Sequence, residues 1–258
     1  MLQQPTMNMD ELIKLILPAV IGGFMGIIGG IISSIFATRS KMKEIAETFS
    51  LEQRAKENEA KAKVRIQYLN PLQIATIDFH GRLCDIQSRL NRGDKLLRNT
   101  MQELKERTHQ ADRYVQWVND FGHYALSTLY LTNLYLAHVS KIRSELPFVE
   151  LSSGEDQALL DHLSRVRCAL GGEFGIWENL QDSFGSYIQK GDGSLMNFKE
   201  FCSFIYDDSS FPWFFRLVDF YRDMDLKTPS QLQEMIDSLR ALITFLSDKS
   251  KQALPERE

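Results

Sequence analysis

The segment from Lys190 to Phe201, KGDGSLMNFKEF, contains residue types found in calcium-binding loops of the EF-hand kind. If Gly193 is the glycine at the sixth position of such a loop, Asp192 supplies one ligand. The first and third ligand positions would then be Ile188 and Lys190, which carry no carboxylate, and the twelfth position is a lysine. A calcium site requires several carboxylates, so the segment instead predicts a polar turn between two helices.

His80 and Cys84 lie four residues apart, a spacing at which two side chains of one helix can bind the same metal ion. Neither an H-E-x-x-H motif nor a second ligand pair accompanies them. Adjacent acids, such as Asp207 and Asp208, have the spacing for metal binding or proton transfer, but acidic caps and solvated faces also explain them. The chain has no P-loop, G-x-S-x-G or dinucleotide-binding motif, so no catalytic, cofactor-binding or metal-binding residue is predicted, and no cofactor.

The elements that must position any site are predicted to be helices. No stretch alternates apolar and polar residues with a period of two, so no sheet is expected. Asn70-Pro71 and Thr228-Pro229 are typical helix starts, and Gly81 within the first helix predicts close packing of a neighbour. The fold class is all-α, an irregular bundle of six or seven helices, and the predicted helices cover residues 70–91, 111–146, 155–170, 176–189, 198–206, 212–224 and 229–247.

Charge and cysteine content narrow the possible partners and the compartment. Residues 67–258 hold 21 Lys or Arg against 27 Asp or Glu. Binding of nucleic acid needs clustered Lys and Arg, so nucleic acid is not predicted as a partner. The three cysteines are widely spaced and form no C-x-x-C motif, which favours a reducing compartment.

An uncharged segment near the N-terminus predicts a single transmembrane helix at residues 15–38, after a short tail at residues 1–14. The 23 residues from Leu15 to Ala37 carry no charge, and a helix of that length spans a hydrocarbon core of about 30 Å. A cleaved signal peptide is the alternative, but a basic n-region is missing. The basic residues after the span place the C-terminal domain in the cytoplasm, at the inner (plasma) membrane: Arg39, Lys41 and Lys43.

Glycines recur every four residues within this span. Gly22, Gly26 and Gly30 form a row that Ser34 continues. Small residues at this spacing let two membrane helices approach closely, so the row predicts a helix-association face and a homo-oligomer in the lipid bilayer. The alternative is that glycine is simply frequent in membrane helices.

A charged segment at residues 39–66 follows the span and predicts a helical spacer, because it has no Gly or Pro and pairs Glu with Lys four residues later. Met42, Ile45 and Phe49 form a short apolar seam that ends at Glu52, so a short dimer stalk is the alternative to a solvated spacer. The cytoplasmic domain covers residues 67–250, and residues 251–258 are predicted to be a disordered tail.

The stretch FPWFF contains four aromatic residues, Phe211, Trp213, Phe214 and Phe215. Such a cluster forms either core or a surface for a partner, because aromatic side chains bury large areas in both settings. Both interpretations stay open here.

Four segments resemble a group of uncharacterised membrane-anchored helical proteins found mainly in bacteria: YLNPLQIATIDFHGRLCDI, FGHYALSTLYLTNLYLAHVSKIRSEL, FGIWENLQDSFGSYI and FPWFFRLVDFYRDM. The likeness covers most of residues 66–225. It implies an all-α domain behind an N-terminal anchor and brings neither an activity nor a functional residue.

These features favour a membrane-anchored, non-catalytic interaction, scaffold or regulatory module with an unknown cytoplasmic protein partner. Two alternatives belong to other classes. One is a membrane-bound enzyme whose site forms inside the bundle, and the other is an oligomerising membrane effector.

Overall fold

The computed structural model describes residues 9–106, 111–145, 154–171, 175–224 and 229–252. The chain divides into two compact units, residues 1–60 and 61–258, and each is considered by itself. Every regular element within the described ranges is a helix, apart from one isolated antiparallel bridge between Gln189 and Leu195. The all-α prediction is therefore confirmed for the described residues.

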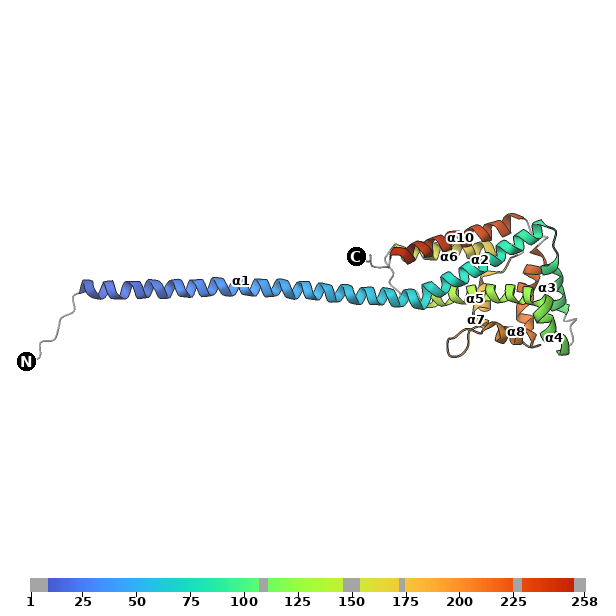
Figure 1. Cartoon of the computed structure of the whole chain (residues 1–258), viewed down its shortest axis with the longest axis horizontal. Coiled ribbons are helices and arrows are strands. Elements are labelled where there is room, and N and C mark those ends of the chain that lie inside the picture. Colours follow the sequence, from blue (N-terminus) through green and yellow to red (C-terminus); the bar gives the residue numbers. More distant parts are fainter. Residues whose placement is uncertain (1–8, 107–110, 146–153, 172–174, 225–228, 253–258) are drawn as a thin grey trace, which may run out of the picture. The chain divides into compact units, whose positions relative to one another are not determined.

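The first unit consists of the helix α1 (Met9–Val64), which continues past the unit boundary (Figure 1). The predicted span and most of the predicted spacer belong to this one unbroken helix. Within the described residues, no helix combines the length and the apolar character needed to cross a membrane. Half of the residues in the span predicted at 15–38 have side chains that the structure does not describe, and the span stays a prediction.

The second unit is a helical bundle that begins with a π-helical turn, η1 (Arg65–Leu69). The remaining elements are α2 (Asn70–Asn91), α3 (Leu96–Glu106), α4 (Ala111–Trp117), η2 (Val118–Gly122), α5 (His123–Glu145), α6 (Glu155–Leu170), α7 (Glu178–Tyr187), α8 (Phe198–Tyr206), η4 (Phe211–Phe214), α9 (Phe215–Arg222) and α10 (Pro229–Gln252).

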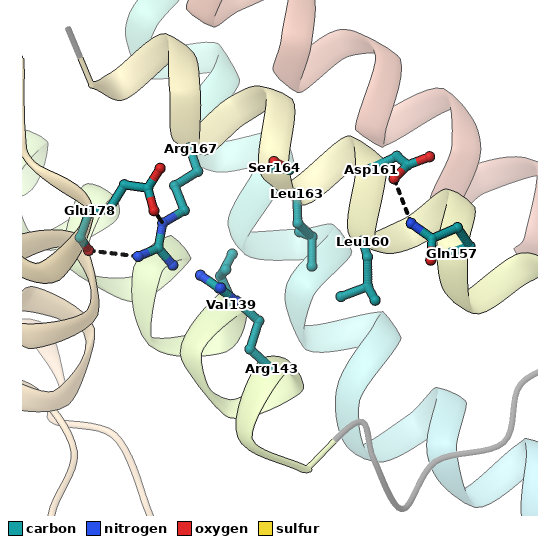
Figure 2. A pocket seen from close by; sticks show the side chains of 9 residues that line it. All are labelled: Val139, Arg143, Gln157, Leu160, Asp161, Leu163, Ser164, Arg167 and Glu178. Atoms are coloured by element: carbon teal, nitrogen blue, oxygen red, sulfur yellow. Dashed lines mark hydrogen bonds and ion pairs between the residues drawn. The ribbon is translucent and has the colours of Figure 1, made fainter.

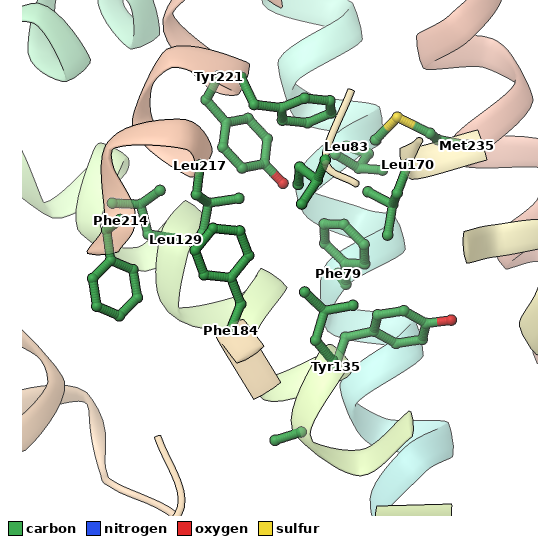
Figure 3. Close-up of a cluster of buried hydrophobic side chains, with 14 of the residues drawn as sticks. Phe79, Leu83, Leu129, Tyr135, Leu170, Phe184, Phe214, Leu217, Tyr221 and Met235 are labelled. Atoms are coloured by element: carbon green, nitrogen blue, oxygen red, sulfur yellow. The ribbon is translucent and has the colours of Figure 1, made fainter. Parts of the chain in front are cut away.

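The helix α2 occupies the middle of the bundle, packed against α5 and α10. Helix α6 lies on α10, α7 on α5, and α3 on α9, as can be followed in Figure 1. One continuous apolar core joins these helices. Figure 3 shows part of it, with Phe79 and Leu83 of α2 facing Leu129 of α5, Phe184 of α7 and Leu217 of α9.

Three predicted helices have the boundaries that the structure shows, and of these only α8 begins with a side-chain cap. The start predicted at Asn70-Pro71 is not a break in the helix, because the backbone is helical from α1 through η1 into α2. Helices α2, α6 and α8 begin and end at or within a residue of the predicted positions. In α8 the cap is a capping box, in which Asn197 and Glu200 bond each other's backbone N–H. The helix predicted at residues 111–146 is interrupted by η2, where Gly122 lies against the Trp117 ring.

Two local features differ from expectation. The helix α3 was not predicted, although Leu97, Met101 and Leu104 are buried at helical spacing. Gly81 was expected to contact a close neighbour, and that prediction is wrong: the residue is exposed, and a Cβ added there would meet nothing within 4 Å.

A close helix contact of the bundle occurs where α7 crosses α5. A Cβ added at Gly185 would lie 2.6 Å from the backbone oxygen of Leu136. That distance is shorter than any van der Waals contact, so the two backbones touch at this crossing. Gly185 is therefore required by the packing of the bundle itself.

Several polar side chains are buried on α5. Thr132 donates to the backbone oxygen of Thr128 at 2.8 Å and is 2.6 Å from the Tyr221 hydroxyl of α9. By contrast, the buried Tyr135 hydroxyl and Asn133 Oδ1 have no hydrogen-bond partner among the described residues. A buried polar atom without a partner costs stability, so these two atoms weaken the core around α5.

Candidate functional site

The residues considered for calcium binding form a polar turn between α7 and α8. Asp192 accepts hydrogen bonds from the backbone N–H of Ser194 (2.9 Å) and from its hydroxyl (2.7 Å). Gly193 has a φ of 80°, a left-handed conformation that favours glycine. Lys190 pairs with Glu200 at 2.8 Å. The polar groups of this segment therefore bond to one another, which agrees with its interpretation as a polar turn.

His80 and Cys84 do lie side by side on α2, with Sγ 3.7 Å from Nε2. Partial burial lowers the pKa of His80, and Arg240 of α10 lowers it further. Among the described residues, no three His, Cys, Asp or Glu side chains are grouped so that they could hold a metal ion. Asp207 directly follows α8, and its Oδ2 accepts hydrogen bonds from the backbone N–H and the hydroxyl of Ser210, at 3.0 and 2.9 Å.

The glycine row of α1 is open within the single chain. Gly22, Gly26, Gly30 and Ser34 are exposed, and a Cβ added at any of the three glycines would meet nothing within 4 Å. Gly23 and Gly29 are equally open. At 100° per residue these two fall on the same side of the helix as the row, so the open face is wider than the predicted one.

The aromatic stretch FPWFF is divided between core and surface. Phe211 and Phe214 are buried, and Phe214 packs against Phe184 and Phe201. Of the two interpretations left open for the stretch, Phe211 and Phe214 therefore fit core and not a partner surface. The 3-10 turn η4 directs them inward and leaves Trp213 and Phe215 exposed.

The bundle exposes a second tryptophan, which sequence reasoning missed. Trp177, directly before α7, is 61% exposed, and Trp213 is 63% exposed. The guanidinium carbon of Arg216 lies 5.7 Å from the centre of the Trp177 ring, and Trp213 packs against Tyr187 at the end of α7. We call Trp177 and Trp213 the aromatic pair; its members lie toward opposite ends of α7.

Arg216 holds this surface in place from α9. Its Nε and Nη2 atoms both donate to the backbone oxygen of Gly175, at 3.0 and 2.7 Å. These bonds fix the segment that carries Trp177 against α9. A rigid exposed indole loses little conformational entropy when it is covered, which suits it to binding a partner.

A cavity of about 330 Å³ lies where α5, α6 and the start of α7 meet, and Figure 2 shows its lining. The α6 residues that face it follow helical spacing. Buried residues of the same helix, such as Leu159 and Val166, pack into the core. The lining consists of Val139, Arg143, Gln157, Leu160, Asp161, Leu163, Ser164, Arg167 and Glu178.

Arg167 is the most buried charged group of this cavity, with 11% of its side chain exposed. Asp182 accepts two hydrogen bonds from it, each of 2.9 Å, and the backbone oxygen of Glu178 accepts a third of 2.9 Å. The hydrogen bonds with Asp182 raise the pKa of Arg167 above its ordinary value. The guanidinium therefore stays charged and ties α6 to α7.

Sequence reasoning missed the cavity because its charged residues come from three helices. Arg143, Arg167 and Glu178 are each ordinary surface residues in their own helical patterns. Only the packing of α5, α6 and α7 brings them together, and no local motif encodes that packing. For Trp177, the one local signal was an aromatic residue directly before a helix start.

No family model matches the chain, and no curated protein and no solved structure matches it. The likeness to membrane-anchored helical proteins of bacteria stays a prediction.

Proposed function

We propose that this chain is a membrane-anchored interaction module. In this proposal α1 holds the chain in the membrane and associates with α1 of other copies. The bundle binds a cytoplasmic protein partner through a surface centred on the aromatic pair.

The exposure of Trp177 and Trp213 is the observation that carries the proposal. Among the described residues, most aromatic side chains of the bundle are buried or partly buried, yet more than half of each of these two indoles is open to solvent. Tryptophan and arginine are the residues most enriched where binding energy concentrates in protein interfaces. Arg216 beside Trp177 supplies that combination on one surface.

The proposed anchor is supported by the uncharged run from Leu15 to Ala37, which lies within the continuous helix α1. Homo-association is supported by the open face that Gly22, Gly26 and Gly30 present. In a bilayer, close backbone contact is a main source of helix association, and such a face permits it.

Chemical cross-linking in intact membranes, followed by mass identification, tests the proposal. We expect the full chain to cross-link to one foreign protein and to itself. The double variant Trp177→Ala, Trp213→Ala should lose the foreign partner and keep the self-cross-link. The matched control is Phe121→Ala, which removes another exposed aromatic side chain of the bundle and should change neither product.

A separate variant tests the proposed association face of α1. Changing Gly22, Gly26 and Gly30 to Leu should abolish the self-cross-link, whereas Met25→Leu, an exposed position of the same helix, should leave it intact. If the aromatic variant binds every recovered protein as well as the wild type does, the proposed partner surface is wrong. Recovery of the chain from the soluble fraction would contradict the proposed anchor.

A further inference from the structure

The cavity between α5, α6 and α7 contains a guanidinium whose donors are incompletely used. The Nε of Arg167 is buried and makes no hydrogen bond with any described residue. Glu178 Oε2 lies 3.3 Å from it, so the two form an ion pair without the geometry of a hydrogen bond. A buried N–H in this condition gains when a better-placed oxygen reaches it.

A second guanidinium converges on the same end of the cavity. Figure 2 shows Arg143 rising from α5 toward Arg167. Its Nη1 lies 3.8 Å from Asp182 Oδ1, beyond hydrogen-bond distance, and its side chain is 44% exposed. Arg143 is therefore held loosely and can turn toward a ligand at little cost.

The rest of the cavity differs in character. Leu160, Leu163 and Val139 supply an apolar wall, and Ser164 supplies a hydroxyl. Asp161 lies at the other end and accepts a hydrogen bond from Gln157 at 2.8 Å. A ligand that fits has a charged end at the arginines and a short apolar end along the leucines.

The charges around the cavity indicate that the charged end of a ligand is negative. Asp182 and Glu178 together balance the two arginines while the cavity is empty. The Glu178 side chain is 66% exposed, and ion pairs this exposed contribute little free energy. Its carboxylate can therefore swing into solvent. At the arginine end this leaves two guanidinium groups facing one carboxylate, that of Asp182, which Arg167 holds by two hydrogen bonds; Asp161 lies at the other end.

We propose that this cavity binds a small amphipathic oxyanion, a carboxylate or phosphate with a short apolar portion. Arg143 and the Nε of Arg167 bind the oxyanion, and Leu160 and Leu163 contact the apolar portion. The Glu178 carboxylate takes the place of the ligand's anion when the cavity is empty. The volume, at the lower end of the roughly 300–1,000 Å³ of ligand cavities, limits the ligand to a small one. This inference does not depend on the proposed interaction module.

Isothermal titration of the full chain, in nanodiscs of phosphatidylcholine, with butyl phosphate as the probe tests the inference. We expect saturable binding that is tighter than binding of inorganic phosphate. Glu178→Gln should tighten it about 2- to 5-fold, the equivalent of one partly exposed ion pair. Arg143→Gln should weaken it by about 10-fold or more, because it removes a charge-assisted donor.

The control is Arg165→Gln, which removes an exposed arginine of α6 that does not line the cavity. It should leave the affinity unchanged. Equal losses in the Arg143 and Arg165 variants would show non-specific charge attraction and overturn the inference. Weaker binding by Glu178→Gln, or no saturable binding by either the wild type or this variant, would also overturn it.

A second arm distinguishes a soluble ligand from a lipid head group. Phosphatidic acid is added to the nanodiscs, and the butyl phosphate titration is repeated. Competition assigns the oxyanion to a lipid, whereas an unchanged titration assigns it to a soluble molecule; the anion site itself stands in both cases.

Discussion

Gly185 of the bundle and the glycine row of α1 have opposite surroundings. In the bundle, Gly185 lies where a Cβ would come within 2.6 Å of the α5 backbone. In α1, a Cβ added at Gly22, Gly26 or Gly30 would meet no described atom within 4 Å. The contacts of the fold thus explain the first glycine and do not explain the others. Glycine disfavours a helix by about 1 kcal/mol relative to alanine. The α1 glycines therefore need an explanation outside the contacts that this chain makes with itself.

The strongest test of this comparison is Gly185→Ala. The added methyl overlaps the Leu136 backbone oxygen, and relieving such an overlap in a packed core costs about 3 kcal/mol. We expect the free energy of unfolding of the full chain to fall by this amount in a urea titration followed by circular dichroism.

Gly81→Ala is the matched control, because this α2 glycine is exposed and has no neighbour within 4 Å. There the gain in helix propensity should raise the free energy of unfolding by up to about 1 kcal/mol. Equal effects of the two substitutions would show that α5 and α7 do not touch.

A smaller effect is expected from polar pairs inside the bundle. Thr132→Val removes the hydroxyl that lies 2.6 Å from the buried Tyr221 hydroxyl, and the partner left unpaired should cost about 1–2 kcal/mol. Tyr135→Phe removes a buried hydroxyl that has no partner among the described residues. It should therefore be neutral or stabilising in the same urea titration. A loss in both variants would mean that Tyr135 also has a hydrogen-bond partner.

His138 makes the stability of the bundle depend on pH. Burial, with a contribution from Lys141, lowers its pKa from 6.5 to about 4. Between these values the unfolded chain binds the proton and the folded chain does not, so the free energy of unfolding falls as the pH drops through this range. Urea midpoints at about pH 7 and about pH 5 should differ less in His138→Gln than in the wild type. An equal difference in both proteins would contradict the assignment.

The smallest effect on stability is expected in α1. Gly26→Ala adds a methyl that meets no described neighbour, so the urea midpoint of the bundle should stay the same within error. The yield of self-cross-linked chain in membranes should change, since the methyl enlarges the proposed association face. A drop in the urea midpoint would show that another part of this chain packs against α1.

Sequence predicts this fold where the signals are local. The capping box of Asn197 and Glu200 defines the start of α8 where the sequence predicts it. Asn70-Pro71 has the same kind of local signal, yet the helix continues through it from η1 into α2. The aromatic stretch shows the limit, because Trp213 and Phe214 are adjacent yet one is exposed and the other buried. Their directions depend on the 3-10 turn η4, which composition does not reveal.

The cavity could not be predicted, for a related reason. Its two arginines lie on α5 and α6, and their approach depends on how those helices pack against α2, α7 and α10. Helical periodicity shows which face of a helix is apolar. It does not show which polar faces meet.

Because the aromatic pair is exposed, tryptophan fluorescence of the chain depends on whether this surface is covered. The chain has three tryptophans; the third, Trp117, is partly buried and donates a hydrogen bond to Glu103 at 2.9 Å. Emission of the free chain should therefore be dominated by water-exposed indoles and lie at long wavelength. Covering Trp177 and Trp213 would shift the emission toward the blue, so occupancy of this surface can be followed without a label.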